Sequence, residues 1–362
     1  MLVLHVGPHK TATTWLQHNF YHNRKALEGA GWLYPETGER VRVGHHDLSD
    51  NAPEILKPGS RKVREIRRIA EKAAARGLNI LLSSEGFRNW KPQHIEALQR
   101  IVAPHELHIV YCLRDPASLI YSFWAQQVKT GQTLSFPEFE EKHFSRPLKS
   151  RILNPGIELK ALREIEGARL TVLLYDEIRR SGRDIFDVFC TDVLKIEALP
   201  HAPEAAGNDR EPIEMTEFMR LVQRRIGNFK EEADVNIGRV FRYMLGSRKR
   251  DEIVAAVSAV TAARRSREIN RELPVFTELE KRMLNRYRAH MIPKPGNGTL
   301  FLRGNQVCIY YDEETLVADP KVARLLDDTA RKFRPGGLRM WVASWSRFWL
   351  TLYRRIMKAV KR

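Results

Sequence analysis

A lysine and three threonines follow a short apolar run at the start of the chain, within Val3–Trp15 (VLHVGPHKTATTW). The run Leu2–Val6 predicts a buried strand that stops at Gly7-Pro8, and a helical pattern begins at about Thr13. A strand that leads through a tight loop into a helix gathers free backbone N–H groups and the positive end of the helix around one point. Because Lys10 and the hydroxyls project into the same space, this stretch predicts a phosphate-binding loop.

The loop differs from the Walker A motif, which places a glycine directly before Lys-Ser/Thr. Here His9 precedes Lys10, and the lysine is followed by clustered hydroxyls on Thr11, Thr13 and Thr14. A kinase that uses ATP and Mg²⁺ expects the Walker A lysine context, together with a hydroxyl and an Asp that hold the metal. The loop therefore predicts a phosphate ligand but does not fix the nucleotide.

A second group of candidate phosphate ligands lies in YCLRDPASLIYSFW. Arg114 ends an apolar run, and Ser122 follows eight positions later, two turns into the next predicted helix. Arginine offers planar, permanently charged donors to a phosphate, and serine adds a hydroxyl. The alternative for Arg114-Asp115 is a local ion pair at a strand end, which contributes little if it is exposed.

An alternating series of strands and helices must position these residues. Buried strands are predicted at Asn79–Ser83, Leu107–Leu113 and Arg169–Tyr175, and helices at Thr14–Leu27, Arg61–Arg76, Pro92–Val102, Ala117–Lys129 and Ile185–Leu194. This alternation predicts an α/β fold with a P-loop-like parallel sheet flanked by helices. Ligands of such sheets lie beyond the carboxyl ends of the strands, where Lys10, Glu85, Arg114 and Tyr175 are expected.

From about residue 210 the sequence favours long basic helices, at Pro212–Arg225, Val240–Leu245, Asp251–Ala263 and Glu278–His290. We therefore expect a core over 1–210, a mainly helical cap on the acceptor side over 211–335, and a basic amphipathic helix over 336–362. Within the cap, Thr299–Tyr311 predicts a hairpin that turns at Gly304-Asn305, and a helix is expected near Lys321–Phe333.

The predicted C-terminal helix carries an aromatic and apolar face formed by Trp341, Trp345, Phe348, Trp349, Leu352 and Ile356, and a basic face formed by Arg347, Arg354, Lys358 and Lys361. A helix of this kind is suited to an anionic membrane interface. The alternative is a C-terminal helix that docks its tryptophan face on the core.

The chain of 362 residues has 61 Lys and Arg against 44 Asp and Glu, a formal net charge of +17. This excess favours a polyanionic partner, with a basic solvated surface as the alternative. Nucleic-acid binding would rest on charge alone, and no matching module is recognised. Three scattered cysteines fit a reducing compartment, and neither a signal peptide nor a membrane-spanning run is expected. We therefore expect a cytoplasmic protein, peripheral on the inner face of the membrane through its tail.

Together, the two phosphate-binding stretches resemble the sulfotransferase family, most closely its bacterial, carbohydrate-sulfating branch. GPHKTATTW is similar to the strand–loop–helix with which the family binds the 5′-phosphosulfate of 3′-phosphoadenosine 5′-phosphosulfate (PAPS). LRDPASLIYS is similar to the family's Arg and Ser for the 3′-phosphate. The resemblance covers about residues 1–200. It implies sulfuryl transfer from PAPS, with adenosine 3′,5′-bisphosphate as the product and no metal.

The resemblance implies that the donor is bound by Pro8, His9, Lys10, Thr11, Ala12, Thr13, Thr14, Trp15, Arg114, Ser122 and Tyr175. Lys10 would contact the bridging oxygen and the transferring group, Trp15 would stack on adenine, and Tyr175 would lie near the base. Ala12 stands where the family usually has glycine, a replacement that is tolerable if φ at this position is negative. The Gly-rich basic motif that completes the 3′-phosphate site in many members is missing, and Arg334-Pro335-Gly336-Gly337 is a faint echo of it.

Sulfuryl transfer also needs a base that takes the proton of the acceptor. Glu85 is the first candidate, because it ends the second strand beside the loop. At an ordinary pKa of about 4.3 it is ionised at neutral pH, and partial burial is expected to raise its basicity. His46 and His45 are the second candidates, as base or as acceptor ligands. The alternatives are a carboxylate that caps Lys10 or a helix start, and histidines with surface or capping roles.

These patterns predict a PAPS-dependent sulfotransferase that acts on a hydroxyl of a carbohydrate-like, anionic acceptor, free or lipid-linked. Fold and donor site do not fix the acceptor. Two alternatives remain: a P-loop kinase that uses ATP, and a non-catalytic protein with the same core that binds polyanions or membranes.

Overall fold

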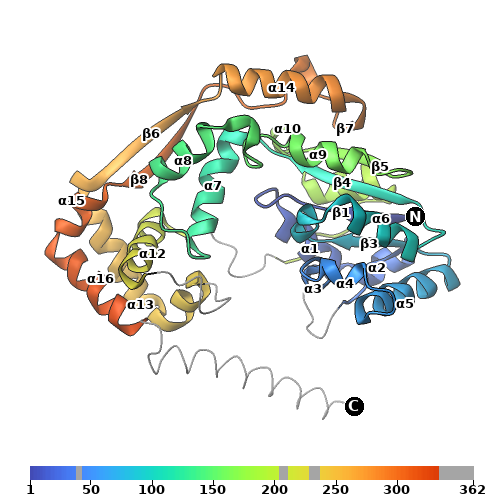
Figure 1. The fold of residues 1–362 in the computed structure, drawn as a ribbon, viewed down its shortest axis with the longest axis horizontal. Coiled ribbons are helices and arrows are strands. Elements are labelled where there is room, and N and C mark those ends of the chain that lie inside the picture. The colour runs from blue at the N-terminus through green and yellow to red at the C-terminus, as the bar shows by residue number, and fades with distance from the viewer. Residues whose placement is uncertain (38–42, 204–210, 228–236, 334–362) are drawn as a thin grey trace, which may run out of the picture. The chain divides into compact units, whose positions relative to one another are not determined.

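The computed structural model describes residues 1–37, 43–203, 211–227 and 237–333. The chain forms two compact units (Figure 1). Unit 1 comprises Met1–Ile120, Arg146–Asn208 and Asn270–Asn305, and unit 2 comprises Tyr121–Ser145, Asp209–Ile269 and Gln306–Arg362. These units differ from the expected division, since residues 121–145 group with the cap and residues 270–305 with the core. The predicted helix over 336–362 and Arg334-Pro335-Gly336-Gly337 lie outside the described residues.

A parallel sheet forms the centre of unit 1. Among the described residues it has six strands in the order β2 (Trp32–Leu33), β3 (Asn79–Ser83), β1 (Leu2–His5), β4 (Leu107–Leu113), β5 (Arg169–Leu174) and β7 (Met291–Ile292). β1 lies between β3 and β4, with His5 opposite Ser83 and Val110. The parallel sheet and its flanking helices confirm the predicted α/β fold.

Both faces of this sheet are buried, which explains the continuous apolar character of its strands. Leu2 and Leu4 of β1 belong to one core cluster, to which α5 (Arg61–Ala75), α6 (Pro92–Ile101), α9 (Gly156–Arg163) and α14 (Pro274–Tyr287) contribute. Val3 belongs to the opposite cluster, with α1 (Thr13–His22), α2 (Arg24–Gly29), α10 (Tyr175–Arg180) and α11 (Ile185–Val188). Successive side chains of a strand alternate between the two layers, so the sheet is held from both sides.

Most predicted helices are present with small shifts of their ends, but the helix expected over Thr14–Leu27 is divided. α1 ends at His22, and α2 begins at Arg24. The Asn23 side chain between them donates hydrogen bonds to the carbonyls of Asn19 (3.1 Å) and Pro200 (2.8 Å). Two further short helices, α3 (His46–Ser49) and α4 (Ala52–Ile55), follow, and neither was predicted from the sequence.

Unit 2 combines helices with a two-stranded sheet. Its described helices are α8 (Phe136–Phe144), α12 (Ile213–Ile226), α13 (Ile237–Ala259, kinked at Gly246), α15 (Glu313–Ala318) and α16 (Pro320–Lys332), and its sheet pairs β6 (Arg264–Asn270) with β8 (Asn305–Tyr311). α7 (Pro116–Val128) begins in unit 1 and continues into unit 2. The buried Arg220 binds Glu217 (2.6 Å) and Glu313 (2.9 Å) inside this unit.

The predicted hairpin over Thr299–Tyr311 is wrong. β8 forms as expected, but its partner is β6 rather than the residues before Gly304. Leu300 and Phe301 are buried in the core of unit 1, and their N–H groups donate to the Glu280 carboxylate at 2.6 and 2.8 Å. These bonds satisfy the backbone of this run within unit 1 and remove it from strand pairing.

Candidate active site

The loop between β1 and α1 has an unusual backbone. Gly7, Lys10 and Ala12 all have positive φ angles, of 86°, 68° and 58°. A Cβ atom on Gly7 would lie 3.1 Å from both Cα and Cβ of Glu85, so this position also lacks space for a side chain. Glycine is therefore required at position 7 both by conformation and by the close approach of the next strand end.

Two of the three predicted hydroxyl ligands shape the loop itself. The hydroxyls of Thr11 and Thr13 donate to the Pro8 carbonyl, at 2.6 and 3.1 Å, and both residues are buried. Thr14 is exposed on the first turn of α1. None of the described side chains caps the start of α1, so the N–H groups of its first turn are oriented for an anion.

Ala12 does not meet the condition of a negative φ under which alanine would replace glycine without strain. It precedes α1 in the left-handed conformation, with φ 58° and ψ 22°. A Cβ atom in this region costs about 1 to 2 kcal/mol, which glycine does not incur. The loop thus holds an alanine in a conformation that suits glycine, and the strain lies directly at the helix start that faces the predicted phosphate.

We expect Ala12→Gly to stabilise the protein by up to about 1 kcal/mol, because the relief of strain exceeds the extra entropy of glycine in the unfolded chain. Urea unfolding would measure the change. Ala74→Gly, at an exposed position inside α5, is the matched control and should destabilise by about 0.5 to 1 kcal/mol. Equal destabilisation by both substitutions would contradict the strain at Ala12.

Arg114 connects the two predicted phosphate-binding stretches. Its Nη1 donates to the Lys10 carbonyl at 2.6 Å, while its buried Nε has no hydrogen-bond partner among the described residues. The guanidinium lies 5.4 Å from the centre of the Tyr175 ring, and that of Arg179 lies 5.8 Å from the same ring. Lys10, Arg114 and Tyr175 therefore meet at one edge of the sheet, as expected.

The local ion pair considered for Arg114 and Asp115 is replaced by a longer-range pair. Asp115 binds Arg271 Nε at 3.0 Å, and Arg271 also donates to the Ser118 hydroxyl at 3.0 Å. The Asp115 N–H donates to Asp176 at 2.6 Å. Asp115 thus anchors the turn after β4, and the Arg114 guanidinium binds the loop at the Lys10 carbonyl instead of pairing with Asp115.

Two other predicted donor-binding residues have less direct evidence. The indole N–H of Trp15 donates to both carboxylate oxygens of Asp184, at 3.0 and 3.1 Å, and the ring is half-buried. Ser122 lies on α7, in the part of that helix that belongs to unit 2. The roles of Trp15 with adenine and of Ser122 with the 3′-phosphate stay predictions.

Glu85 lies beside the loop, as expected of the candidate base. Gln17 Nε2 donates to Glu85 Oε2 at 3.1 Å, and His9 Nδ1 is 3.7 Å from Oε1. Burial acts to raise the pKa of Glu85, but His46, His9 and the hydrogen bonds to the carboxylate outweigh it and hold this pKa below its ordinary value. The expected increase in basicity is therefore wrong. Burial lowers the pKa of His9, although the Glu85 carboxylate beside it acts to raise this pKa.

The two adjacent histidines differ in environment. His45 is buried, accepts a hydrogen bond from the Ser83 N–H (2.9 Å) and contacts the Pro35 carbonyl (2.9 Å), and burial lowers its pKa to about 4. Both ring nitrogens are occupied, so His45 is not available as a base. His46 begins α3, is half-buried, and lies 3.2 Å from the Ser84 hydroxyl. It remains the second candidate.

Several supporting residues escaped the sequence prediction. Gln17, Ser84 and Asp184 each contact a predicted site residue through a side chain, and Arg271 contacts Asp115, the neighbour of Arg114. Gln17 lies one helical turn after Thr13 and could have been found from that spacing. Nothing in the sequence brings Arg271 to Asp115, because only the fold joins positions that far apart.

Comparison with known proteins gives one match. The sequence model of the sulfotransferase domain matches residues 2–194, more than half of the chain. No curated protein matches, and no solved structure matches. The matched region contains the strand, loop and helix around Lys10, the end of β4 with Arg114, and β5 with Tyr175. The chain belongs to the sulfotransferase family.

Proposed function

We propose that this sulfotransferase moves the sulfuryl group of PAPS to a hydroxyl of a carbohydrate-like, anionic acceptor, free or lipid-linked. The observation that carries the donor assignment is the Arg114 guanidinium. It holds the loop through the Lys10 carbonyl and keeps a second, buried donor without a partner among the described residues. A nucleotide with phosphates at both ends fits a site in which one cation joins two phosphate-binding stretches.

The donor site has the properties that such a ligand requires. The start of α1 has no side-chain cap among the described residues, and positive φ angles at Lys10 and Ala12 turn the backbone before it. Arg114 Nε is a buried donor whose desolvation a phosphate oxygen would offset. When bound, PAPS supplies an activated sulfuryl group. Lys10 and the helix start are then placed to stabilise negative charge that develops on the leaving phosphate.

Glu85 is proposed as the group that takes the acceptor's proton. Gln17 orients its carboxylate, and the close contact with Gly7 fixes its backbone beside the loop. A carboxylate with a lowered pKa is ionised at neutral pH, so it can accept a proton. His46, linked to Ser84 next to Glu85, is the alternative base.

The pH dependence of kcat/KM distinguishes these bases. A base must be unprotonated, and because the Glu85 pKa lies below its ordinary value, activity should stay level as the pH falls to about 5.5. Glu85→Gln should lower kcat/KM by about 10²-fold or more and leave the binding of adenosine 3′,5′-bisphosphate intact. An activity loss centred near pH 6 to 7, the ordinary range of an imidazole, together with a fully active Glu85→Gln, would instead assign the base to a histidine.

A transfer screen tests the proposed function directly. The protein would be incubated with PAPS labelled in its sulfate and with glycans, lipid-linked glycans and phenols as acceptors. Label on a glycan, together with tight binding of adenosine 3′,5′-bisphosphate and not of ATP, is the expected result. Binding of ATP alone would favour the kinase, and label on no acceptor would favour a non-catalytic protein.

We also propose a cytoplasmic location at the inner face of the membrane, reached through the basic tail over 336–362. The charge pattern of the tail supports this proposal. Among the described residues, no helix is long and apolar enough to cross a bilayer. Flotation with anionic vesicles, with and without residues 338–362, would test it.

A further inference from the structure

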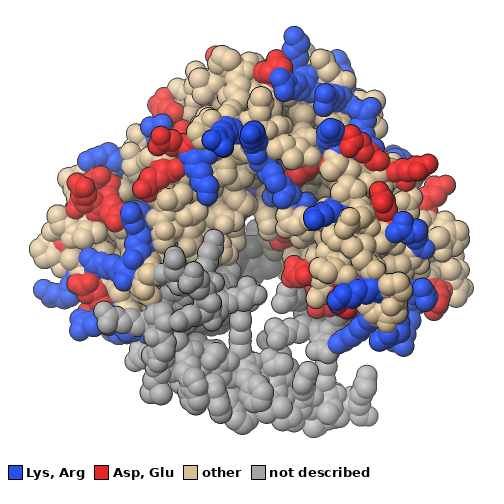
Figure 2. Space-filling view, in the orientation of Figure 1, with Lys and Arg blue, Asp and Glu red and all other residues tan. Residues whose placement is uncertain are grey.

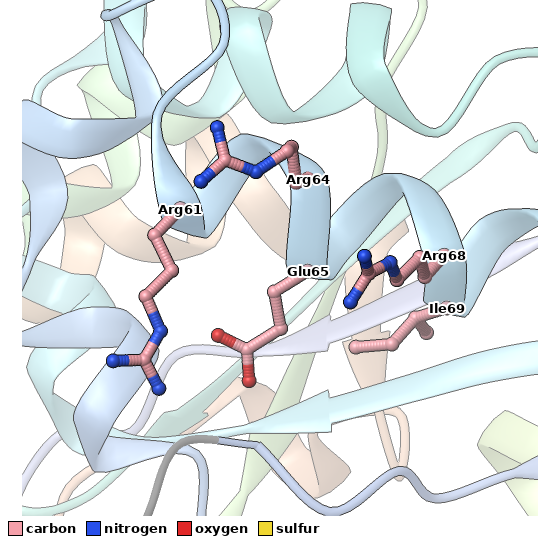
Figure 3. A pocket seen from close by; sticks show the side chains of 5 residues that line it. All are labelled: Arg61, Arg64, Glu65, Arg68 and Ile69. Carbon is pink, nitrogen blue, oxygen red and sulfur yellow. The ribbon is translucent and has the colours of Figure 1, made fainter.

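The described surface does not by itself mark where the acceptor binds. The groove in Figure 3, of about 520 Å³, is lined by five residues of α5, and none of these five is a candidate site residue. Figure 2 shows Lys and Arg side chains beside Asp and Glu over the described surface in view, rather than one uniform basic field. The polar groups next to the candidate base Glu85 are more informative.

Two buried serine hydroxyls lie next to the candidate base. Ser84, the residue before Glu85, and Ser49, at the end of α3, bond to each other through their Oγ atoms at 2.8 Å. The Ser49 hydroxyl also donates to the His46 carbonyl at 3.1 Å, and Ser84 Oγ accepts from the Gly86 N–H at 3.1 Å. A Cβ atom on Gly86 would clash with Ser49 Oγ, so this approach requires glycine. The two serines thus join α3 to the turn that carries Glu85.

These hydroxyls determine which ring nitrogen of His46 carries the proton. Its Nδ1 lies 3.2 Å from Ser84 Oγ. Ser49 has one hydroxyl hydrogen, which the His46 carbonyl receives, so the hydrogen between the two serines comes from Ser84. Ser84 then has no hydrogen left for the ring, and the contact with Nδ1 is a hydrogen bond only if Nδ1 donates. The hydrogen-bond pattern therefore assigns the proton to Nδ1 and the lone pair to Nε2.

The neighbouring His45 has the opposite assignment. Its Nδ1 accepts a hydrogen bond from the Ser83 N–H at 2.9 Å, so its proton lies on Nε2, which donates to the Pro35 carbonyl at 2.9 Å. Both ring nitrogens of His45 are used within the fold. His46 Nε2, by contrast, makes no hydrogen bond with any of the described residues. Of the two histidines, His46 keeps an acceptor atom that the described part of the fold does not use.

The His46 ring lies close to the Glu85 carboxylate. Ser84, which contacts the ring at 3.2 Å, directly precedes Glu85 in the chain. Burial acts to raise the pKa of Glu85, and the charge of protonated His46, the next largest influence, lowers it. A charge shifts a pKa in this way only over a short distance. His46 Nε2 and the Glu85 carboxylate therefore border one region of unit 1.

We propose that His46 Nε2 accepts a hydrogen bond from a second hydroxyl of the acceptor, next to the hydroxyl whose proton Glu85 takes. Ser84 and Ser49 are positioning residues, because they hold the tautomer with the lone pair on Nε2. This inference rests on the proposed function and deepens it, since the acceptor becomes a molecule with adjacent hydroxyls, as on a sugar ring. A phenol or an alcohol with one hydroxyl would lose this contact.

The tautomers can be measured by NMR of the full chain labelled in its histidine ring nitrogens, because protonated and unprotonated ring nitrogens differ in chemical shift. We expect Nδ1–H for His46 and Nε2–H for His45, which is the internal control. Ser49→Ala releases the Ser84 hydrogen for Nδ1, so it should move His46 toward the Nε2–H form. Ser145→Ala, which removes an exposed hydroxyl after α8, should change neither ring. An Nε2–H tautomer of His46 in the native protein would overturn the inference, whatever the stability of the variants.

The contact with an acceptor is tested in the same spectra. The probes are two hexasaccharides with adjacent free hydroxyls, hexagalacturonate and cellohexaose, and the forms of both in which every hydroxyl is methylated. At least one free hexasaccharide should shift the Nε2 signal of His46, and it should bind Ser49→Ala about 3-fold more weakly than the native protein. A shift caused equally by the methylated form, or by neither free hexasaccharide, would contradict the contact.

Variants of His46 separate an acceptor contact from a base. His46→Gln keeps a side-chain oxygen that can accept a hydrogen bond, whereas His46→Leu does not. With the acceptor that takes the label in the transfer screen, His46→Gln should stay within about 3-fold of the native kcat/KM, and His46→Leu should lose about 10-fold, mainly through KM. The control His22→Leu, at an exposed position of α1, should have native kinetics. A loss of about 100-fold or more in both His46 variants would make His46 the base and overturn the inference.

Failure of the proposed function gives a different result from failure of this inference. If a free hexasaccharide shifts the His46 signal as expected but no acceptor receives sulfate, the transfer function fails and a carbohydrate contact remains. If sulfate is transferred and both His46 variants have native kinetics, the function holds and the inference is wrong.

Discussion

Lys10→Ala should lower kcat/KM for sulfuryl transfer by about 10²- to 10³-fold, the cost of removing one preorganised charge at a developing anion. The fold should tolerate the substitution, because alanine and lysine are equally unfavourable at the φ of 68° found there. Initial rates with labelled PAPS and a saturating acceptor would measure the effect. The loop carbonyl that Arg114 binds belongs to the backbone and remains in place.

The control for this substitution is Lys25→Ala, which removes an exposed lysine from α2. Its activity should match that of the native protein. A Lys10→Ala enzyme with native kcat/KM would show that Lys10 does not act on the leaving group. It would favour the alternative of a non-catalytic protein that binds polyanions or membranes. A loss of unfolding free energy equal to that of a core substitution would instead make Lys10 a structural residue.

Arg114→Gln should weaken the binding of adenosine 3′,5′-bisphosphate by about 100-fold, because a charge-assisted donor and the support of the loop disappear together. Arg114→Lys is the informative companion. It keeps the charge but loses the planar fork that reaches the Lys10 carbonyl and lies near the Tyr175 ring, so we expect an intermediate affinity.

Calorimetric titration with adenosine 3′,5′-bisphosphate would measure both variants, with Arg179→Gln as a neighbouring control. Arg179 lies near the same ring but, within the described part of the chain, makes no hydrogen bond or ion pair with the loop, so its loss should change affinity by less than 10-fold. If Arg114→Gln lowers the unfolding midpoint and leaves the affinity unchanged, the residue only holds the loop, and the donor assignment is wrong.

The sequence was sufficient for the sheet and for the edge where the site lies. A strand that is buried on both faces has an unbroken run of apolar residues in the sequence. The positions of β1, β3, β4 and β5 could therefore be predicted to within a residue or two. Their polar successors Lys10, Glu85 and Arg114 then had to meet at one edge, because parallel strands end on the same side. The match to the sulfotransferase domain rests on this same region.

Features that depend on distant partners could not be predicted. β8 pairs with β6, and Leu300 and Phe301 donate their N–H groups to the Glu280 carboxylate instead of to a strand. The lowered pKa of Glu85 depends on two histidines from other segments, and its burial alone suggested the opposite direction. The positive φ of Ala12 was missed for a local reason: alanine is uncommon there, and its neighbours do not indicate the strain.

The absent side chain at Gly7 has a consequence for the divergence of this protein from its relatives. Residues 7 and 85 pack closely against each other, since a Cβ atom on Gly7 would lie 3.1 Å from Cα and Cβ of Glu85. A substitution at position 7 would therefore displace the backbone of the candidate base along with the loop. Lineages that change the base chemistry at position 85 should do so with glycine still opposite, and the two positions should be inherited as a pair.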